Sequence, residues 1–114
     1  MTTLPAFDDA VIGKLTDLFG AVADATRLQI LLLVFDAERR SGEIAAALEM
    51  TASAVSHQLR WLRDRRIVAA RKQGRETYYQ LADDCIRELL CIALQHVQEE
   101  DGSGGTPSSP SSCA

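Results

Sequence analysis

Apolar residues recur at helical spacing through most of this chain, and the first third contains two such segments. One follows Asp8, whose carboxylate can accept hydrogen bonds from the first backbone N–H groups of a helix. The other follows Asp24, which can cap in the same way, and covers residues 25–35. Residues 30–34 are apolar on every side, which is typical of a helix at the centre of a core. The pattern predicts two helices, with Gly20 loosening the chain between them. The apolar face of the first helix consists of Val11, Ile12, Leu15, Leu18 and Phe19.

Two further helices are predicted on either side of a very short turn. Ser41 can cap a third helix, and Thr51 can cap a fourth that covers residues 52 to about 65. Met50 and Thr51 form the connection. Two short helices joined by so few residues are typical of a helix-turn-helix. The residues expected to be buried are Ile44, Ala45 and Leu48 in the third helix and Val55, Leu59 and Leu62 in the fourth.

A hairpin and a last helix complete the expected fold. Residues 67–72 and 77–81 are rich in Val, Ile, Thr and Tyr and flank a turn around Gln73 and Gly74. A fifth helix is expected over Asp84–Glu100. The whole pattern predicts a mainly α protein with a small β-hairpin, a winged helix-turn-helix with four helices, two strands and one helix. The apolar stripe of the last helix consists of Ile86, Leu89, Leu90, Ala93, Leu94 and Val97.

The length of 114 residues allows one domain, and the composition changes near residue 101. Residues 1–100 carry the helix and strand patterns. Residues 101–114 are mostly Gly, Ser, Thr and Pro, which cannot bury a core, and we expect this tail to be disordered. A chain this short gains stability by pairing with a copy of itself. We therefore expect a homodimer formed through the terminal helices.

Nothing in the sequence predicts export or membrane insertion. No apolar run approaches the roughly 20 residues of a membrane-spanning helix. Residues 1–9 contain Asp8 and Asp9 instead of a basic region followed by an apolar one, so no secretory signal is visible. The cysteines are odd in number and crowded into the last third, unlike a secreted disulfide framework. We expect a cytoplasmic protein with no membrane partner, whose cysteines act as thiolates. They are Cys85, Cys91 and Cys113.

The basic residues are concentrated in one stretch of an acidic chain. Residues 60–75 hold seven cations and one acid, a net charge of +6, whereas the whole chain carries −4. Because charges beyond roughly 10 Å are screened, a local basic surface can attract phosphate on an acidic protein. The alternative is that these arginines only solvate a helix face.

The fourth predicted helix has the composition of a DNA-reading element. Val55 and Leu59 face inward, while short polar residues lie on or near its remaining surface, toward the helix N-terminus. A glutamine such as Gln58 can form paired hydrogen bonds to adenine, and serines can contact bases or phosphates. The alternative is an ordinary soluble surface helix with His57 simply exposed.

The hairpin that follows places cations around its tip, where they suit a phosphate track or a minor groove. The alternative is a turn kept soluble by its charge. Trp61, Tyr78 and Tyr79 are expected to be packing residues. The predicted contacts to double-stranded DNA are Thr51, Ser53, Ser56, His57, Gln58, Arg60, Arg71, Lys72 and Arg75.

Three segments together resemble the ArsR/SmtB family of metal-responsive bacterial repressors, over roughly residues 15–100. They are residues 18–31 (LFGAVADATRLQIL), 53–62 (SAVSHQLRWL) and 74–79 (GRETYY). The resemblance implies a winged-helix dimer that binds operator DNA without its effector and leaves the DNA when the effector binds.

The resemblance also implies where an effector could bind. The family's third-helix sites use a cysteine pair, and residues 38–45 contain no cysteine. Its other site lies on the last helix, as Asp-x-His followed eleven residues later by His-x-x-Glu. This chain matches with one change, since Cys85 replaces the first histidine. The implied metal ligands are Asp83, Cys85, His96 and Glu99.

Helix geometry constrains how these residues could share an ion. Eleven residues are about three turns, so Cys85 and His96 face the same way but lie about 16 Å apart along the axis. One ion could join them only if two such helices cross antiparallel at a two-fold axis, which makes two equal sites. Thiolate, imidazole and carboxylate ligands suit zinc or cadmium. The alternative is a last helix that serves only dimerisation.

The proposed mechanism is release of operator DNA when zinc or cadmium bridges the paired last helices. A first rival keeps the fold and makes Cys85, Cys91 and Cys113 an arsenite or thiol-redox sensor. A second rival is a winged helix that binds protein instead of DNA. An enzyme is not expected, because His57 and His96 have no evident partnered nucleophile and no phosphate-binding glycine loop is present.

Overall fold

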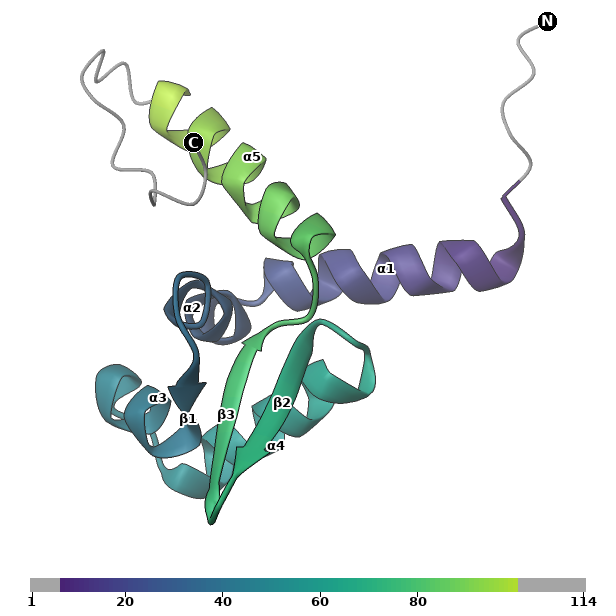
Figure 1. Ribbon diagram of the computed structural model, residues 1–114. Coiled ribbons are helices and arrows are strands. Elements are labelled where there is room, and N and C mark those ends of the chain that lie inside the picture. The colour runs from purple at the N-terminus through teal and green to yellow at the C-terminus, as the bar shows by residue number, and fades with distance from the viewer. Residues whose placement is uncertain (1–6, 101–114) are drawn as a thin grey trace, which may run out of the picture.

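Four helices precede a β-hairpin and one helix follows it, as the computed structural model shows for residues 7–100 (Figure 1). A two-residue strand between the second and third helices joins the hairpin in a small antiparallel sheet. The predicted mainly α winged helix-turn-helix is confirmed. The expected disordered tail, 101–114, lies outside the described residues. The elements are α1 (Asp9–Ala23), α2 (Ala25–Leu33), β1 (Arg39–Arg40), α3 (Ser41–Leu48), α4 (Ala52–Asp64), β2 (Val68–Gln73), β3 (Glu76–Leu81) and α5 (Asp84–Glu100).

Three of the predicted helix caps are confirmed by hydrogen bonds from backbone N–H groups to the capping side chains. Asp8 accepts from Val11 N at 2.9 Å, and Asp24 accepts from Arg27 N at 2.9 Å. Thr51 accepts from Ala54 N at 3.1 Å. Each bond satisfies a donor that the first turn of a helix leaves unpaired.

The predicted cap of α3 was wrong. Ser41 is the first residue of the helix, and Arg40 occupies the N-cap position. The backbone N–H of Arg40 donates to the Glu43 carboxylate at 2.9 Å, so the side chain at the third helical position replaces the expected serine cap. The helix ends at Leu48, its C-cap Glu49 takes the left-handed conformation (φ 54°), and the chain turns directly into α4. The helix-turn-helix is thereby formed.

The sheet has three strands in the order β1-β3-β2, all antiparallel, where the sequence predicted two. The additional strand, β1, pairs Arg39 with Tyr79 and Arg40 with Tyr78. The β2–β3 hairpin closes through Gly74 and Arg75, one position later than expected. Gly74 has φ +65°, which glycine tolerates without a Cβ penalty. We call this hairpin (residues 68–81) the wing.

The core lies where α2, α3, α4, the wing and α5 meet. The centre of α2, the inward side of α4 and the start of α5 all contribute, as the apolar pattern predicted. Its members are Ala21, Ile30, Leu31, Val34, Phe35, Ile44, Ala45, Val55, Leu59, Leu62, Ile67, Val68, Leu81, Ile86, Leu90 and Cys91.

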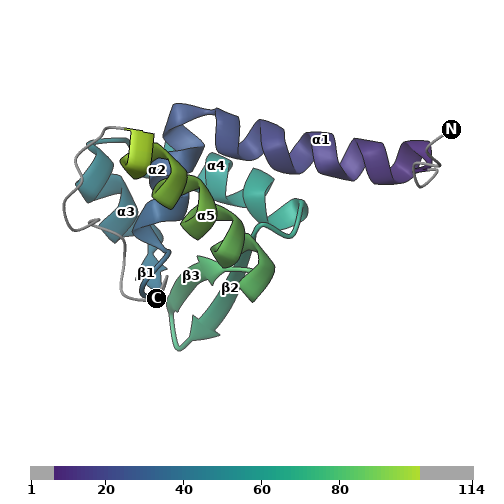
Figure 2. The ribbon, with the colours of Figure 1, turned by 90° about the horizontal axis from the view of Figure 1, so that it is seen from above.

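Helix α1 extends away from this core, and both views show its N-terminal half uncovered by any other described element (Figures 1 and 2). Most of its predicted apolar face is therefore exposed, with Leu18 the member that packs against the core. Helix α5 is buried at its start and exposed further along. The large apolar side chains left exposed on these two helices are Val11, Ile12, Leu15, Phe19, Ile92 and Val97. Among the described residues, no helix is long and apolar enough to cross a membrane.

Candidate DNA-binding surface and candidate metal ligands

The outward side of α4 carries a row of polar side chains. Burial of Val55, Leu59 and Leu62 fixes the opposite side of the helix on the core. The exposed side presents two hydroxyls, an imidazole and a guanidinium, which can donate to or accept from base edges and phosphates. These side chains line a shallow depression on the helix surface. The row consists of Ser53, Ser56, His57 and Arg60, and Thr51 is also exposed at the helix start.

Gln58 differs from the other predicted base readers. It is half-buried on the flank of α4 that faces α2, and its Oε1 accepts a hydrogen bond from Arg27 Nε at 3.1 Å. The two residues are 31 positions apart in the chain. The side chain is therefore held against α2 instead of extending from the outward row.

Trp61 lies on the same flank and is half-buried against the core, as expected of a packing residue. Its ring is also covered by two guanidinium groups. The Cζ of Arg27 lies 3.9 Å from the ring centroid and that of Arg65 lies 3.8 Å from it. Arg65 in turn pairs with Asp17 of α1 at 3.8 Å. Sequence reasoning missed both stacks. Arg65 follows Trp61 by four residues, so its stack could have been found from helical spacing, whereas Arg27 lies on α2 and meets Trp61 only in the folded chain.

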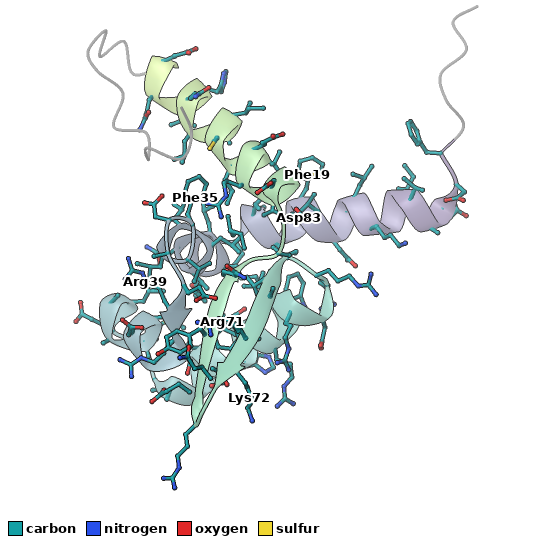
Figure 3. All side chains as sticks on the ribbon, in the orientation of Figure 1. Phe19, Phe35, Arg39, Arg71, Lys72 and Asp83 are labelled. Carbon is teal, nitrogen blue, oxygen red and sulfur yellow. The ribbon has the colours of Figure 1, made fainter. Side chains whose placement is uncertain are left out.

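The wing carries the predicted cations, but they are not equivalent. Arg71 donates to both carboxylate oxygens of Glu38, at 2.9 and 2.7 Å. Hydrogen bonds from Arg71 hold the pKa of the Glu38 carboxyl below its ordinary value, and the same pair raises the pKa of Arg71. Lys72 is exposed nearer the tip (Figure 3). Arg75 is exposed in the turn between β2 and β3. The charge of Arg71 is thus largely compensated within the protein.

The four predicted metal ligands lie on or beside α5. Asp83 Oδ1 accepts from Ile86 N at 2.9 Å, so this carboxylate caps the helix (Figure 3). Cys85 is an exposed free thiol, and His96 and Glu99 are exposed near the other end. Within one chain, the described residues contain no group of three or more His, Cys, Asp or Glu that could hold an ion. Cys91 is buried on α5, and Cys113 lies outside the described residues.

The element order and the exposed polar side of α4 beside a basic wing define a winged helix-turn-helix protein, the class that regulates transcription. The family described as "Bacterial regulatory protein, arsR family" matches residues 24–70, from the cap of α2 to the middle of β2. The "Transcriptional repressor SmtB homolog" of Synechocystis is 40% identical over 88 residues, which span 77% of this chain and 67% of that protein. The chain belongs to the arsR family of bacterial regulatory proteins, a family of transcription regulators and not of enzymes.

Solved structures of other proteins support the same assignment to a family of winged helix-turn-helix regulators. The "homodimeric winged helix-turn-helix DNA-binding domain" of Mb0332 from Mycobacterium bovis has a TM-score of 0.75 and 28% identity, and the match covers 90% of this chain and 96% of that one. The "cadmium metal-sensor CMTR" from Mycobacterium tuberculosis has a TM-score of 0.63 and 38% identity, with 73% and 86% covered.

Proposed function

We propose that this protein is a homodimeric repressor that binds operator DNA through α4 and the wing, and that zinc or cadmium binding releases it. The exposed polar row of α4 beside the cations of the wing is the observation that carries the DNA-binding part. A helix with one side fixed on a core and short polar residues on the other can enter a major groove. Lys72 and Arg75 then suit the flanking phosphates or minor groove.

Dimerisation is supported by apolar surface that a single chain leaves uncovered. Phe19 is 52% exposed on α1, and Ile92 and Val97 are 65% and 57% exposed on α5. Covering such side chains with a second copy removes apolar area from water at roughly 25 cal/mol per Å². The sequence led us to expect a dimer formed through the terminal helices, which includes α5. The exposed apolar side chains of α1 offer a second surface for dimerisation. The homodimeric state of the Mb0332 domain supports a homodimer here.

The proposed metal ligands fit a site shared between subunits better than one within a chain. The spacing of Cys85 and His96 on one helix separates them by about 16 Å, which is too far for a shared ion. In a dimer with antiparallel α5 helices, Asp83 and Cys85 of one subunit meet His96 and Glu99 of the other. One thiolate, one imidazole and two carboxylates form a tetrahedral donor set that suits zinc or cadmium. The cadmium-sensing relative supports this choice of ion.

Metal binding releases the DNA if the ion stabilises a dimer geometry that differs from the geometry that binds DNA. The two α4 helices must lie about 34 Å apart to enter successive major grooves. An ion that joins the α5 helices fixes how the subunits are oriented and so changes that separation. By linkage, metal weakens DNA binding by the same factor by which DNA weakens metal binding, typically about 5- to 150-fold.

The test measures binding of the full chain to a duplex selected from random-sequence DNA, by fluorescence anisotropy. Wild type should bind one motif in preference to others, with affinity falling steeply as salt rises. His57→Ala should weaken binding, whereas Gln29→Ala, which removes an exposed polar side chain from α2, should not. Zinc or cadmium should then release the DNA.

Two results would overturn the proposal. Failure to select any motif would remove the DNA-binding part and favour a protein partner for the winged helix. Specific binding that neither zinc nor cadmium alters would leave a DNA-binding protein and remove the metal response.

A thiol response is the second candidate, because Cys85 is an exposed free thiol at the start of α5. Arsenite or an oxidant would then act through Cys85 together with Cys91 and Cys113. The structure places Cys85 at the surface as a free thiol, whereas Cys91 is buried and disulfide-bonded, so the two sulfur atoms differ in environment and in oxidation state. Release by arsenite, and not by zinc or cadmium, would favour this candidate.

A further inference from the structure

The hydrogen bond between Arg27 and Gln58 constrains how α4 can read DNA. Arg27 lies in the first turn of α2, and its Nε donates to Oε1 of Gln58 at 3.1 Å. An isolated glutamine can turn its amide to place either the oxygen or the nitrogen toward a base. With the oxygen held by a cation, the orientation of this amide is set inside the protein.

Arg27 is itself held in place by Trp61. Its guanidinium lies 3.9 Å from the ring centroid, and that of Arg65 also covers the ring, at 3.8 Å. A planar guanidinium on an aromatic face is attracted by the negative face of the ring, which favours this placement of Arg27. Arg65 pairs with Asp17, which ties the stack to α1. The donor that orients Gln58 is therefore preorganised.

The remaining hydrogen-bonding group of Gln58 is its amide NH2. We propose, on the basis of the DNA-binding function above, that Arg27 is a positioning residue that makes Gln58 a hydrogen-bond donor to an acceptor on the base edge. Gln58 then selects guanine or thymine at its position, and not adenine as the sequence alone suggested. Gln58 is half-buried and directly follows His57 of the exposed row of α4.

The base edges explain the selection. In the major groove, guanine presents the acceptors O6 and N7, and thymine presents O4. Adenine and cytosine each present an amino group at the equivalent place. A glutamine free to rotate meets adenine with both its oxygen and its nitrogen. When Arg27 fixes the oxygen, the amide NH2 can still donate to N7 of adenine, but the second hydrogen bond, from the adenine amino group to the glutamine oxygen, is lost. On cytosine the NH2 meets only another donor.

The experiment selects binding sites from random duplex DNA with the full-length protein and its variants, and compares base preference position by position. Gln58→Ala identifies the base pair that Gln58 contacts, since the preference for one base should fall at that position of the motif alone. Wild type should prefer guanine or thymine at that position. Arg27→Met keeps the aliphatic part of the side chain and removes the guanidinium. It should reduce this preference by roughly 2- to 10-fold, the effect of losing one hydrogen-bonded constraint.

Two further variants separate orientation from folding and from charge. Gln58→Glu keeps an oxygen for Arg27 and replaces the amide NH2 with an acceptor, so the preference should change from guanine or thymine to cytosine or adenine, whose amino groups donate. The Gln58→Glu test remains informative even if the Arg27→Met protein does not fold. Lys14→Met removes a cation from α1 and should leave every preference unchanged.

The outcomes are distinct. An adenine preference at the Gln58 position that persists in Arg27→Met would overturn the positioning role, as would a Gln58→Ala protein with an unchanged motif. A wild-type protein that selects no motif at all would overturn the proposed function and this inference with it.

Discussion

Arg71 and Glu38 join the wing to the segment before β1 through two hydrogen bonds, 2.9 and 2.7 Å long. The guanidinium meets both carboxylate oxygens, a bidentate arrangement that fixes direction as well as distance. Arg71 also donates to Gln73 on its own strand at 2.8 Å. The pair therefore joins the middle of β2 to the segment between α2 and β1, although the sequence assigned Arg71 to DNA.

Glu38→Gln should make the wing less protected against hydrogen exchange in a pH-dependent way. The lowered pKa of Glu38 means that the native state favours the charged carboxylate. Its stabilising effect is full above the ordinary pKa of 4.5 and is lost as the pH falls through the lower native pKa. Wild type and variant should differ at pH 7 and converge in acid.

Arg71→Met is the matched variant for this pair. It should produce the same loss of protection, and the double variant should show no more than either single change. Additive effects of the two substitutions would show that the pair does not hold the wing.

The wing cations should differ in their contribution to DNA affinity. Lys72→Met and Arg75→Met each remove an exposed charge, so each should reduce the slope of log K against log salt by about 0.9. Arg71→Met should change the slope much less, because Glu38 already compensates its charge. Equal slope changes for all three variants would contradict this distinction, and the measurement is a salt titration on one selected duplex.

Three helix caps and the last helix were predicted correctly because they depend on residues that are close together in the chain. Asp8, Asp24 and Thr51 cap helices within three residues of their own positions, so their roles depend on nothing distant. The last helix, Asp84–Glu100, was predicted at the observed bounds because its apolar stripe is long. Strand β1 was missed because two residues form no readable pattern.

Distant contacts explain what the sequence could not predict about the candidate site. Arg71 looked like a DNA contact, and its partner Glu38 is 33 residues away in the chain. Gln58 looked like a free base reader, and Arg27 is 31 residues away. In both cases a polar residue that seemed available from local composition is engaged by a side chain that only the fold brings near.

Leu62→Ala should destabilise the domain strongly. Leu62 is fully buried on the inward side of α4, and a truncated leucine leaves a cavity as well as losing transfer free energy. We expect the free energy of unfolding to fall by about 2–5 kcal/mol in urea denaturation. Leu32→Ala is the control, since Leu32 is 37% exposed on α2 and should cost less.

Replacing Cys91 and Cys113 together by alanine should leave zinc- or cadmium-induced release of DNA intact. The proposed site uses only Cys85 among the three cysteines, and Cys91 is buried on α5. Anisotropy of the DNA complex during metal titration measures the response. A lost metal response in the double variant would favour the thiol or arsenite sensor instead, provided that binding to DNA without metal is unchanged.

Mixing two defective subunits should restore one metal site, because each site takes ligands from both chains. Cys85→Ser and His96→Ala homodimers each lack a ligand at both sites and should bind cadmium weakly. In the mixed dimer, the intact Cys85 of one subunit and the intact His96 of the other meet at a single site. Co-expressed, differently tagged subunits should therefore bind about one ion per dimer, with sulfur-to-cadmium absorption in the ultraviolet. A site within one chain would give no such recovery, since each subunit would still lack one of its own ligands.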